Sequence, residues 1–119
     1  MNYFSDDELR CQCGCDQLTF DDAFRKKLNE IRDDFARPMV ISSGYRCPNH
    51  PVEARKERPG THSYGVAVDV AVSHGDALDL IETALRHGIK RIGVNQKGSG
   101  RFIHLDASED HYSPTIWSY

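Results

Sequence analysis

The sequence predicts an α+β fold, in which a small antiparallel or mixed sheet has helices packed on one face. Three observations support this class. Two segments carry apolar residues at helical spacing, one central segment alternates between valine and other residues, and two later segments are joined by a glycine-rich turn. Helical patterns come mostly early in the chain and strand patterns mostly later, which is typical of α+β proteins.

Composition narrows the class of protein. The 119 residues are expected to form one domain, because a second core would need roughly 50 more residues. A hydrophobic fraction of 39% and a charged fraction of 28% are typical of a soluble globular protein. The net charge of −3 argues against a nucleic-acid partner, which would require a surplus of cations. No apolar run approaches the ~20 residues that span a bilayer, and we expect a monomer without a membrane span.

The first half of the chain predicts two helices and a strand. A short helix is expected to start at Asp6, because Ser5 and Glu8 form a capping box, and to end near the cysteines. A longer helix is expected over residues 21–35, until Pro38 prevents its continuation. Residues 39–42 predict a short buried strand, and the polar, proline-rich residues 47–61 predict a long loop. The apolar positions of the longer helix are Ala23, Phe24, Leu28, Ile31 and Phe35.

The second half predicts the main part of the sheet. Residues 66–72 alternate as a strand, with four valines on one face and Ala67, Asp69 and Ala71 on the other. A helix is expected from Asp76 to His87, followed by Gly88 in a left-handed cap. Residues 91–94 and 101–106 predict an antiparallel hairpin across a glycine-rich turn. The apolar face of the helix is formed by Ala77, Leu80, Ile81, Ala84 and Leu85.

The four cysteines allow three interpretations. Cys11, Cys13 and Cys15 are separated by single residues, and Cys47 stands alone. They could be free thiols in a reducing cytosol, or Cys47 could form a disulfide with one member of the cluster. A structural zinc site is the third interpretation, although the single-residue spacing departs from the usual two to four residues.

Asp69 and His104 require a chemical explanation. Asp69 lies in the middle of the valine-rich strand, where burial of an unpaired carboxylate would cost several kcal/mol. His62 precedes that strand, and Gly65 allows the chain to turn sharply between them. Alternation in the last strand places His104 on one face together with Phe102 and Asp106.

If the two strands pair, His62, Asp69 and His104 can meet at one point. Two imidazoles and one carboxylate form a three-ligand zinc set with a fourth position open, which is the catalytic arrangement. Taken singly, each histidine is more typical of an ordinary surface or core residue, and Asp69 could accept hydrogen bonds from a loop. The combination favours a metal site.

Three blocks of sequence resemble the zinc D-alanyl-D-alanine carboxypeptidase-like peptidases, a superfamily that includes peptidoglycan peptidases, phage endolysins and the hedgehog domain. The blocks are Ser43–Arg46, Thr61–Asp69 and Phe102–Asp106, and the resemblance extends over residues 39–117. It implies that His62, Asp69 and His104 bind zinc. It also implies that Arg46 binds the substrate carboxylate or the developing oxyanion.

The sequence departs from this family at the general base. Several relatives carry a glutamate shortly before the last histidine ligand, but no carboxylate occurs among residues 99–103. We therefore expect Asp106 to take the proton of the attacking water, with orientation of the His104 ring as the alternative role. Tyr64 and Trp117 are expected to contact the substrate, although both are equally compatible with packing.

The resemblance implies a zinc peptidase that cleaves a bond involving a D-amino acid in peptidoglycan stem peptides or cross-links, as a D,D- or L,D-carboxypeptidase or an endopeptidase. The acidic residues 1–8 do not form a secretory signal. We expect cytoplasmic synthesis and action on the bacterial cell wall, as for a phage endolysin or a virion-associated enzyme. Two alternatives are a non-catalytic zinc-containing binding module of the same fold and a structural protein whose cysteines bind metal.

Overall fold

A computed structural model of the chain describes residues 2–54, 60–109 and 111–119. It contains a five-stranded mixed sheet with the order β1-β2-β4-β3-β5. Neighbouring strands are antiparallel except β3 and β5, which are parallel. The predicted α+β class is therefore confirmed. In chain order the elements are α1 (Asp6–Leu9), α2 (Asp22–Phe35), β1 (Val40–Ser43), α3 (Pro51–Ala54), the 3₁₀ turn η1 (Thr61–Tyr64), β2 (Ala67–Ala71), α4 (His74–Arg86), β3 (Arg91–Asn95), β4 (Phe102–Asp106) and β5 (Thr115–Ser118).

Side chains cap the first turns of α1 and α2. The Ser5 hydroxyl accepts a hydrogen bond from the backbone of Glu8, and the Glu8 carboxylate accepts one from the backbone of Ser5, which is the predicted capping box. The Asp21 carboxylate caps α2 by accepting the backbone N–H of Phe24. Helix α2 ends at Phe35, and Ala36 caps it in the left-handed conformation before Pro38.

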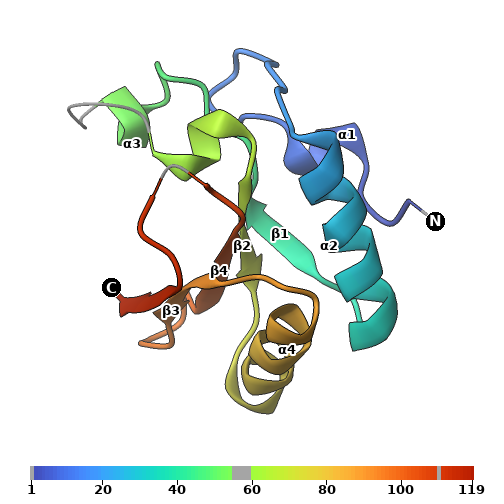
Figure 1. Cartoon of the computed structure of the whole chain (residues 1–119). Helices are drawn as coiled ribbons and strands as arrows, with labels where there is room; N and C mark the ends of the chain where they lie inside the picture. Colours follow the sequence, from blue (N-terminus) through green and yellow to red (C-terminus); the bar gives the residue numbers. More distant parts are fainter. Residues whose placement is uncertain (1, 55–59, 110) are drawn as a thin grey trace.

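The sheet has one apolar face and one polar face. Val68 and Val70 of β2 join Ile103 and Leu105 of β4 in the core beneath α2 and α4. Both helices lie on the same side of the sheet (Figure 1). Alternation therefore sends the remaining side chains of β2 and β4 to the face that these helices do not cover. Asp69 and His104 belong to that second face.

Several local predictions were wrong. Strand β1 is not buried, since it forms an edge of the sheet and Val40 is 61% exposed. The expected loop over 47–61 contains α3 and runs into η1, while its residues 55–59 lie outside the described residues. Helix α4 starts two residues earlier than predicted and buries Thr83 in place of Leu85. Ala23, expected on the apolar side of α2, is exposed.

Strand β5 was not predicted. It is short and follows Pro114, and Trp117 is its one aromatic residue. Its pairing with β3 places it at the second edge of the sheet. Among the residues described, no helix is both long and apolar enough to span a bilayer.

Candidate metal centre

A row of side chains crosses the polar face of the sheet. Asp69 of β2 is paired with His104 of β4, and His104 is paired in turn with Gly93 of β3. Gly93 is also paired with Trp117 of β5. A Cβ atom at Gly93 would lie 2.6 Å from the indole nitrogen of Trp117 and 3.0 Å from the Cβ of His104. Glycine is therefore required for the indole to lie across β3 against the imidazole.

His62 reaches the same point from a tight turn. It lies in η1, which ends at Gly65 with a positive φ of +70°. A Cβ atom at Gly65 would lie 2.3 Å from the carbonyl oxygen of Thr19, so both conformation and space exclude a larger residue. The turn directs the His62 side chain into the polar face immediately before β2 begins.

The three side chains predicted as ligands meet in the structure. The Oδ1 atom of Asp69 lies 2.9 Å from Nδ1 of His104 and 3.3 Å from Nε2 of His62. All three residues are at least 95% buried. Their nitrogen and oxygen atoms all lie within 4.8 Å of one another, close enough to hold one metal ion. The long-range convergence expected from the sequence is present.

The second ring nitrogen of each imidazole forms a hydrogen bond that orients the ring. The Nδ1 atom of His62 lies 2.7 Å from the carbonyl oxygen of Gly44, which can only accept, so Nδ1 carries the proton. The Nε2 atom of His104 lies 2.7 Å from Oδ2 of Asp106. With protons held at these two positions, Nε2 of His62 and Nδ1 of His104 are the nitrogens that would offer lone pairs to a bound metal ion.

Asp106 contacts the His104 ring on the side opposite to Asp69. Its carboxylate is fully buried and accepts hydrogen bonds from Nε of Arg91 at 2.7 Å and from the backbone N–H of Ser108 at 3.1 Å. Although burial opposes ionisation, the hydrogen bond from His104 and that from the Ser108 backbone lower the pKa of Asp106. The group is thus an ionised acceptor for His104.

Asp69 is also held in its ionised form. Burial again opposes the charge, but without a metal ion between them Nδ1 of His104 and Nε2 of His62 donate hydrogen bonds to the carboxylate and lower the pKa of Asp69 well below its ordinary range. A deprotonated carboxylate is the form that binds a metal ion.

Arg46 lies beside the other oxygen of Asp69. Its guanidinium contacts Oδ2 of Asp69 at 3.4 Å and Oε2 of Glu53 at 3.3 Å, and its Nε donates to the Ser43 hydroxyl at 3.0 Å. Glu53 in α3 is 2% exposed and also accepts the backbone N–H of Gly60 at 2.7 Å. This network orients the positive charge of Arg46 toward the three converging side chains.

A cavity of about 420 Å³ opens over this cluster. Arg46 and Trp117, both expected from the sequence to contact the substrate, line this cavity together with His62, Asp69 and His104. Tyr64 is 49% exposed and is not among the lining residues, although its ring lies 6.2 Å from that of His111. Lining residues that the sequence did not indicate as functional include Arg91, Phe102 and His111.

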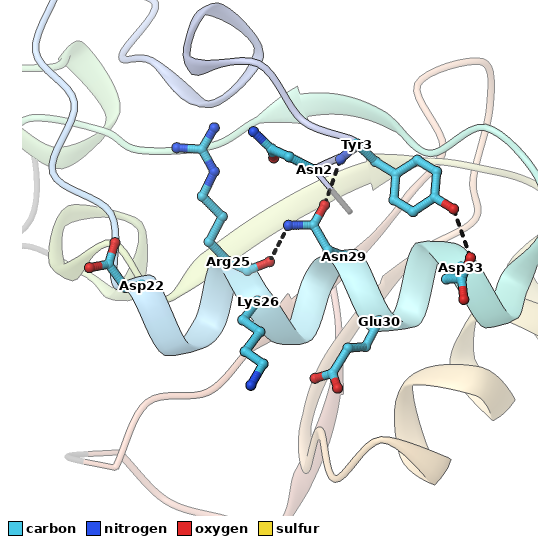
Figure 2. A pocket seen from close by; sticks show the side chains of 8 residues that line it. All are labelled: Asn2, Tyr3, Asp22, Arg25, Lys26, Asn29, Glu30 and Asp33. Carbon is cyan, nitrogen blue, oxygen red and sulfur yellow. Dashed lines mark hydrogen bonds between the residues drawn. The ribbon is translucent and has the colours of Figure 1, made fainter.

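A second hollow of about 460 Å³ lies along the outer side of α2 (Figure 2). Its polar groups bind one another: Asn29 accepts from the backbone of Tyr3 and donates to the carbonyl of Arg25, and the Tyr3 hydroxyl donates to Asp33. Its carboxylates are not among the groups of described residues that could hold a metal ion. The candidate site is therefore the cavity over β2 and β4.

Comparison with known proteins shows which family the sequence resembles. The sequence matches the family model described as Peptidase M15 over residues 2–106, which is most of the chain. No curated protein matches it. The predicted resemblance is confirmed, and the members of this family are zinc-dependent peptidases and therefore hydrolases.

Proposed function

Because the chain belongs to the peptidase M15 family, we propose that it is a zinc peptidase acting on peptidoglycan stem peptides or cross-links, at a bond involving a D-amino acid. The single observation that carries the catalytic assignment is the buried convergence of His62, Asp69 and His104 at the floor of an open cavity. The bacterial cell wall is then the place of action.

The donor set fits zinc. Ligand atoms at ~2.0–2.1 Å from a tetrahedral ion lie about 3.3 Å from one another. Asp69 Oδ1 lies 2.9 Å and 3.3 Å from the two imidazole nitrogens, close to that separation. Three protein ligands leave one coordination position open, as in catalytic rather than structural sites. When bound, zinc would supply a Lewis acid and lower the pKa of water to ~7.

Arg46 is proposed to bind the negative charge of the substrate. Its planar guanidinium can form two parallel hydrogen bonds with a carboxylate and can also stabilise an oxyanion. The contacts with Glu53 and Asp69 hold it at the cavity wall before substrate arrives. Fixed orientation of this kind is what electrostatic stabilisation requires.

Asp106 is proposed to position His104 rather than to act as the base, which is the alternative role weighed from the sequence. Its carboxylate already accepts from three donors and lies on the side of the imidazole opposite to Asp69. Among the described residues, Asp106 is also not one of those that line the cavity. A base must come within hydrogen-bond reach of the proton that it takes.

His111 is proposed to carry the proton instead. It lines the cavity, and the Ser108 hydroxyl lies 2.6 Å from its Nδ1 atom. That contact orients the ring and leaves Nε2 available. Among the described residues that line the cavity, His111 is the histidine that does not belong to the proposed ligand set.

The cavity wall suits a peptide substrate with a terminal carboxylate. Arg46 and Arg91 supply positive charge, while Phe102, Trp117 and Tyr119 supply apolar surface. Tyr64 remains a predicted substrate contact. Its ring lies next to that of His111, which lines the cavity.

Digestion of purified peptidoglycan tests the proposal. We expect release of stem-peptide fragments, identified by mass, that stops on addition of a chelator and resumes with zinc. His104→Ala should abolish release, while His74→Asn, which replaces an exposed imidazole at a positive-φ position where asparagine is tolerated, should not.

The same assay decides between an enzyme and a binding module. The missing glutamate before His104 is the observation that favours a non-catalytic module. Zinc binding and co-sedimentation with cell walls, without chelator-sensitive release of any fragment, would establish that alternative.

A further inference from the structure

The four cysteines form a second cluster outside the candidate active site. Cys11, Cys13 and Cys15 lie in the segment after α1, and Cys47 lies in the segment after β1. The Sγ atom of Cys13 is 3.4 Å from that of Cys47 and 3.5 Å from that of Cys11. All four sulfur atoms lie within 4.8 Å of one another, and none forms a disulfide.

These separations are typical of sulfur atoms around a shared ion. A disulfide joins two sulfurs at ~2.05 Å and would bring together only one pair of the four. Four thiolates at ~2.3 Å from a tetrahedral zinc ion lie about 3.8 Å from one another. A cluster in which all four sulfurs approach one another matches the second arrangement.

Backbone N–H groups point at two of the four sulfur atoms. The backbone N–H of Cys47 donates to Sγ of Cys11 at 3.3 Å, and that of Gln17 donates to Sγ of Cys15 at 3.4 Å. Hydrogen bonds of this kind stabilise the deprotonated form, which is the form that binds a metal. They are an observation independent of the sulfur distances.

We propose that Cys11, Cys13, Cys15 and Cys47 bind one structural zinc ion in a closed four-sulfur site. Binding releases the thiol protons to solvent and involves no change of oxidation state. Because four protein ligands leave no open position, the ion has a structural and not a catalytic role. The proposal is separate from the proposed peptidase function, since it uses none of the residues assigned to it.

The site would join two segments that support the active-site cavity. Cys47 directly follows Arg46, and Gly44, whose carbonyl holds His62, lies close to Leu9. The backbone N–H of Tyr45 donates to the carbonyl of Leu9 at 2.8 Å. An ion at the cysteines would fasten residues 9–15 to the segment that carries Arg46.

Metal analysis tests the proposal on protein purified without oxygen. We expect two zinc ions per chain, falling to one in Cys15→Ser and to one in His62→Ala. Asp16→Asn is the matched control in the same loop, because asparagine tolerates its positive φ of 58°, and it should retain two. Cobalt-loaded protein should show a thiolate-to-cobalt absorption band that His62→Ala retains and Cys15→Ser loses or shifts.

A second measurement uses the unsubstituted chain and does not depend on the folding of a cysteine variant. Titration with an organic mercurial should release one zinc ion as the four thiols react, while the remaining ion stays bound. Release of no zinc by the mercurial would overturn the proposal. So would an unchanged cobalt band in Cys15→Ser. One zinc per chain with a thiolate band would instead support the cysteine site and count against the proposed peptidase.

Discussion

Replacement of Asp106 by asparagine tests how the protein fixes the lone pair of His104. The carboxylate uses Oδ1 to accept from Arg91 and from the backbone of Ser108, and Oδ2 to accept from Nε2 of His104. In Asp106→Asn the amide oxygen must face the two donors, because neither can accept. The amide NH₂ then faces His104, whose Nε2 must become the acceptor.

The consequence is a proton on the wrong nitrogen. With Nε2 accepting, the neutral ring carries its proton on Nδ1, the atom that lies 2.9 Å from Asp69. That proton would occupy the position of the ion. Loss of a partner behind a metal-binding histidine typically lowers metal affinity by about 10- to 100-fold, or about 1.4–2.7 kcal/mol.

Competition with a chromophoric chelator would measure zinc affinity in both proteins, and any zinc at the cysteines cancels in the comparison. Asp79→Asn is the control, since this exposed residue of α4 pairs with Arg37 far from the cavity. Equal affinity of Asp106→Asn and the unsubstituted chain would refute the positioning role. Loss of affinity in the control as well would mean that the effect is not specific to His104.

Three further outcomes are expected. His111→Ala should lower the rate of peptidoglycan hydrolysis by about 10²-fold while zinc content stays the same, and an unchanged rate would exclude it as the proton carrier. Gly93→Ala should lower the free energy of unfolding in urea by about 1–3 kcal/mol and weaken zinc binding, because the added methyl group would lie 2.6 Å from the indole nitrogen of Trp117. Gly100→Ala is the control and should have neither effect, because nothing lies within 4 Å of a Cβ atom at that position. A hydrogen bond from Arg86 lowers the pKa of Asp34 in the folded protein. Asp34 therefore stabilises the fold at pH values above the unfolded-state pKa of ~3.9, and this stabilisation is lost as the pH falls through the lower folded-state pKa. The unfolding free energies of Asp34→Asn and the unsubstituted chain should therefore differ at neutral pH and converge in strong acid, and a difference that does not change with pH would contradict this.

The sequence predicted those parts of the site that local periodicity determines. Alternation along β2 and β4 places Asp69 and His104 on the face opposite the valines, and the short distance from His62 to β2 keeps the third group nearby. The direct pairing of Asp69 with His104 followed once these two strands were neighbours. The capping box of α1 and the limits of α2 are likewise local properties.

Residues brought together by distant segments could not be predicted in this way. Glu53 reads as an ordinary acidic residue of a polar loop, yet it is buried against Arg46. Strand β5 has four residues and becomes a strand by pairing with β3, so no pattern within it indicated its position. His111 has no local signal either, because its role depends on the cavity that other elements form.

In β2 and β4, even-numbered and odd-numbered residues lie on opposite faces of the sheet. One face forms the core, and the other carries the proposed metal ligands. Even-numbered positions of β2 and odd-numbered positions of β4 contact the core, and the intervening positions carry Asp69 and His104. Inserting or deleting one residue within either strand would exchange these sets, turning Asp69 or His104 into the apolar core and removing the valines of β2, or Ile103 and Leu105 of β4, from it. Changes of length are instead tolerable in the exposed turn at residues 97–100. Evolution can thus vary the positions that face the proposed active site by substitution, but not by altering the length of the strands that carry them.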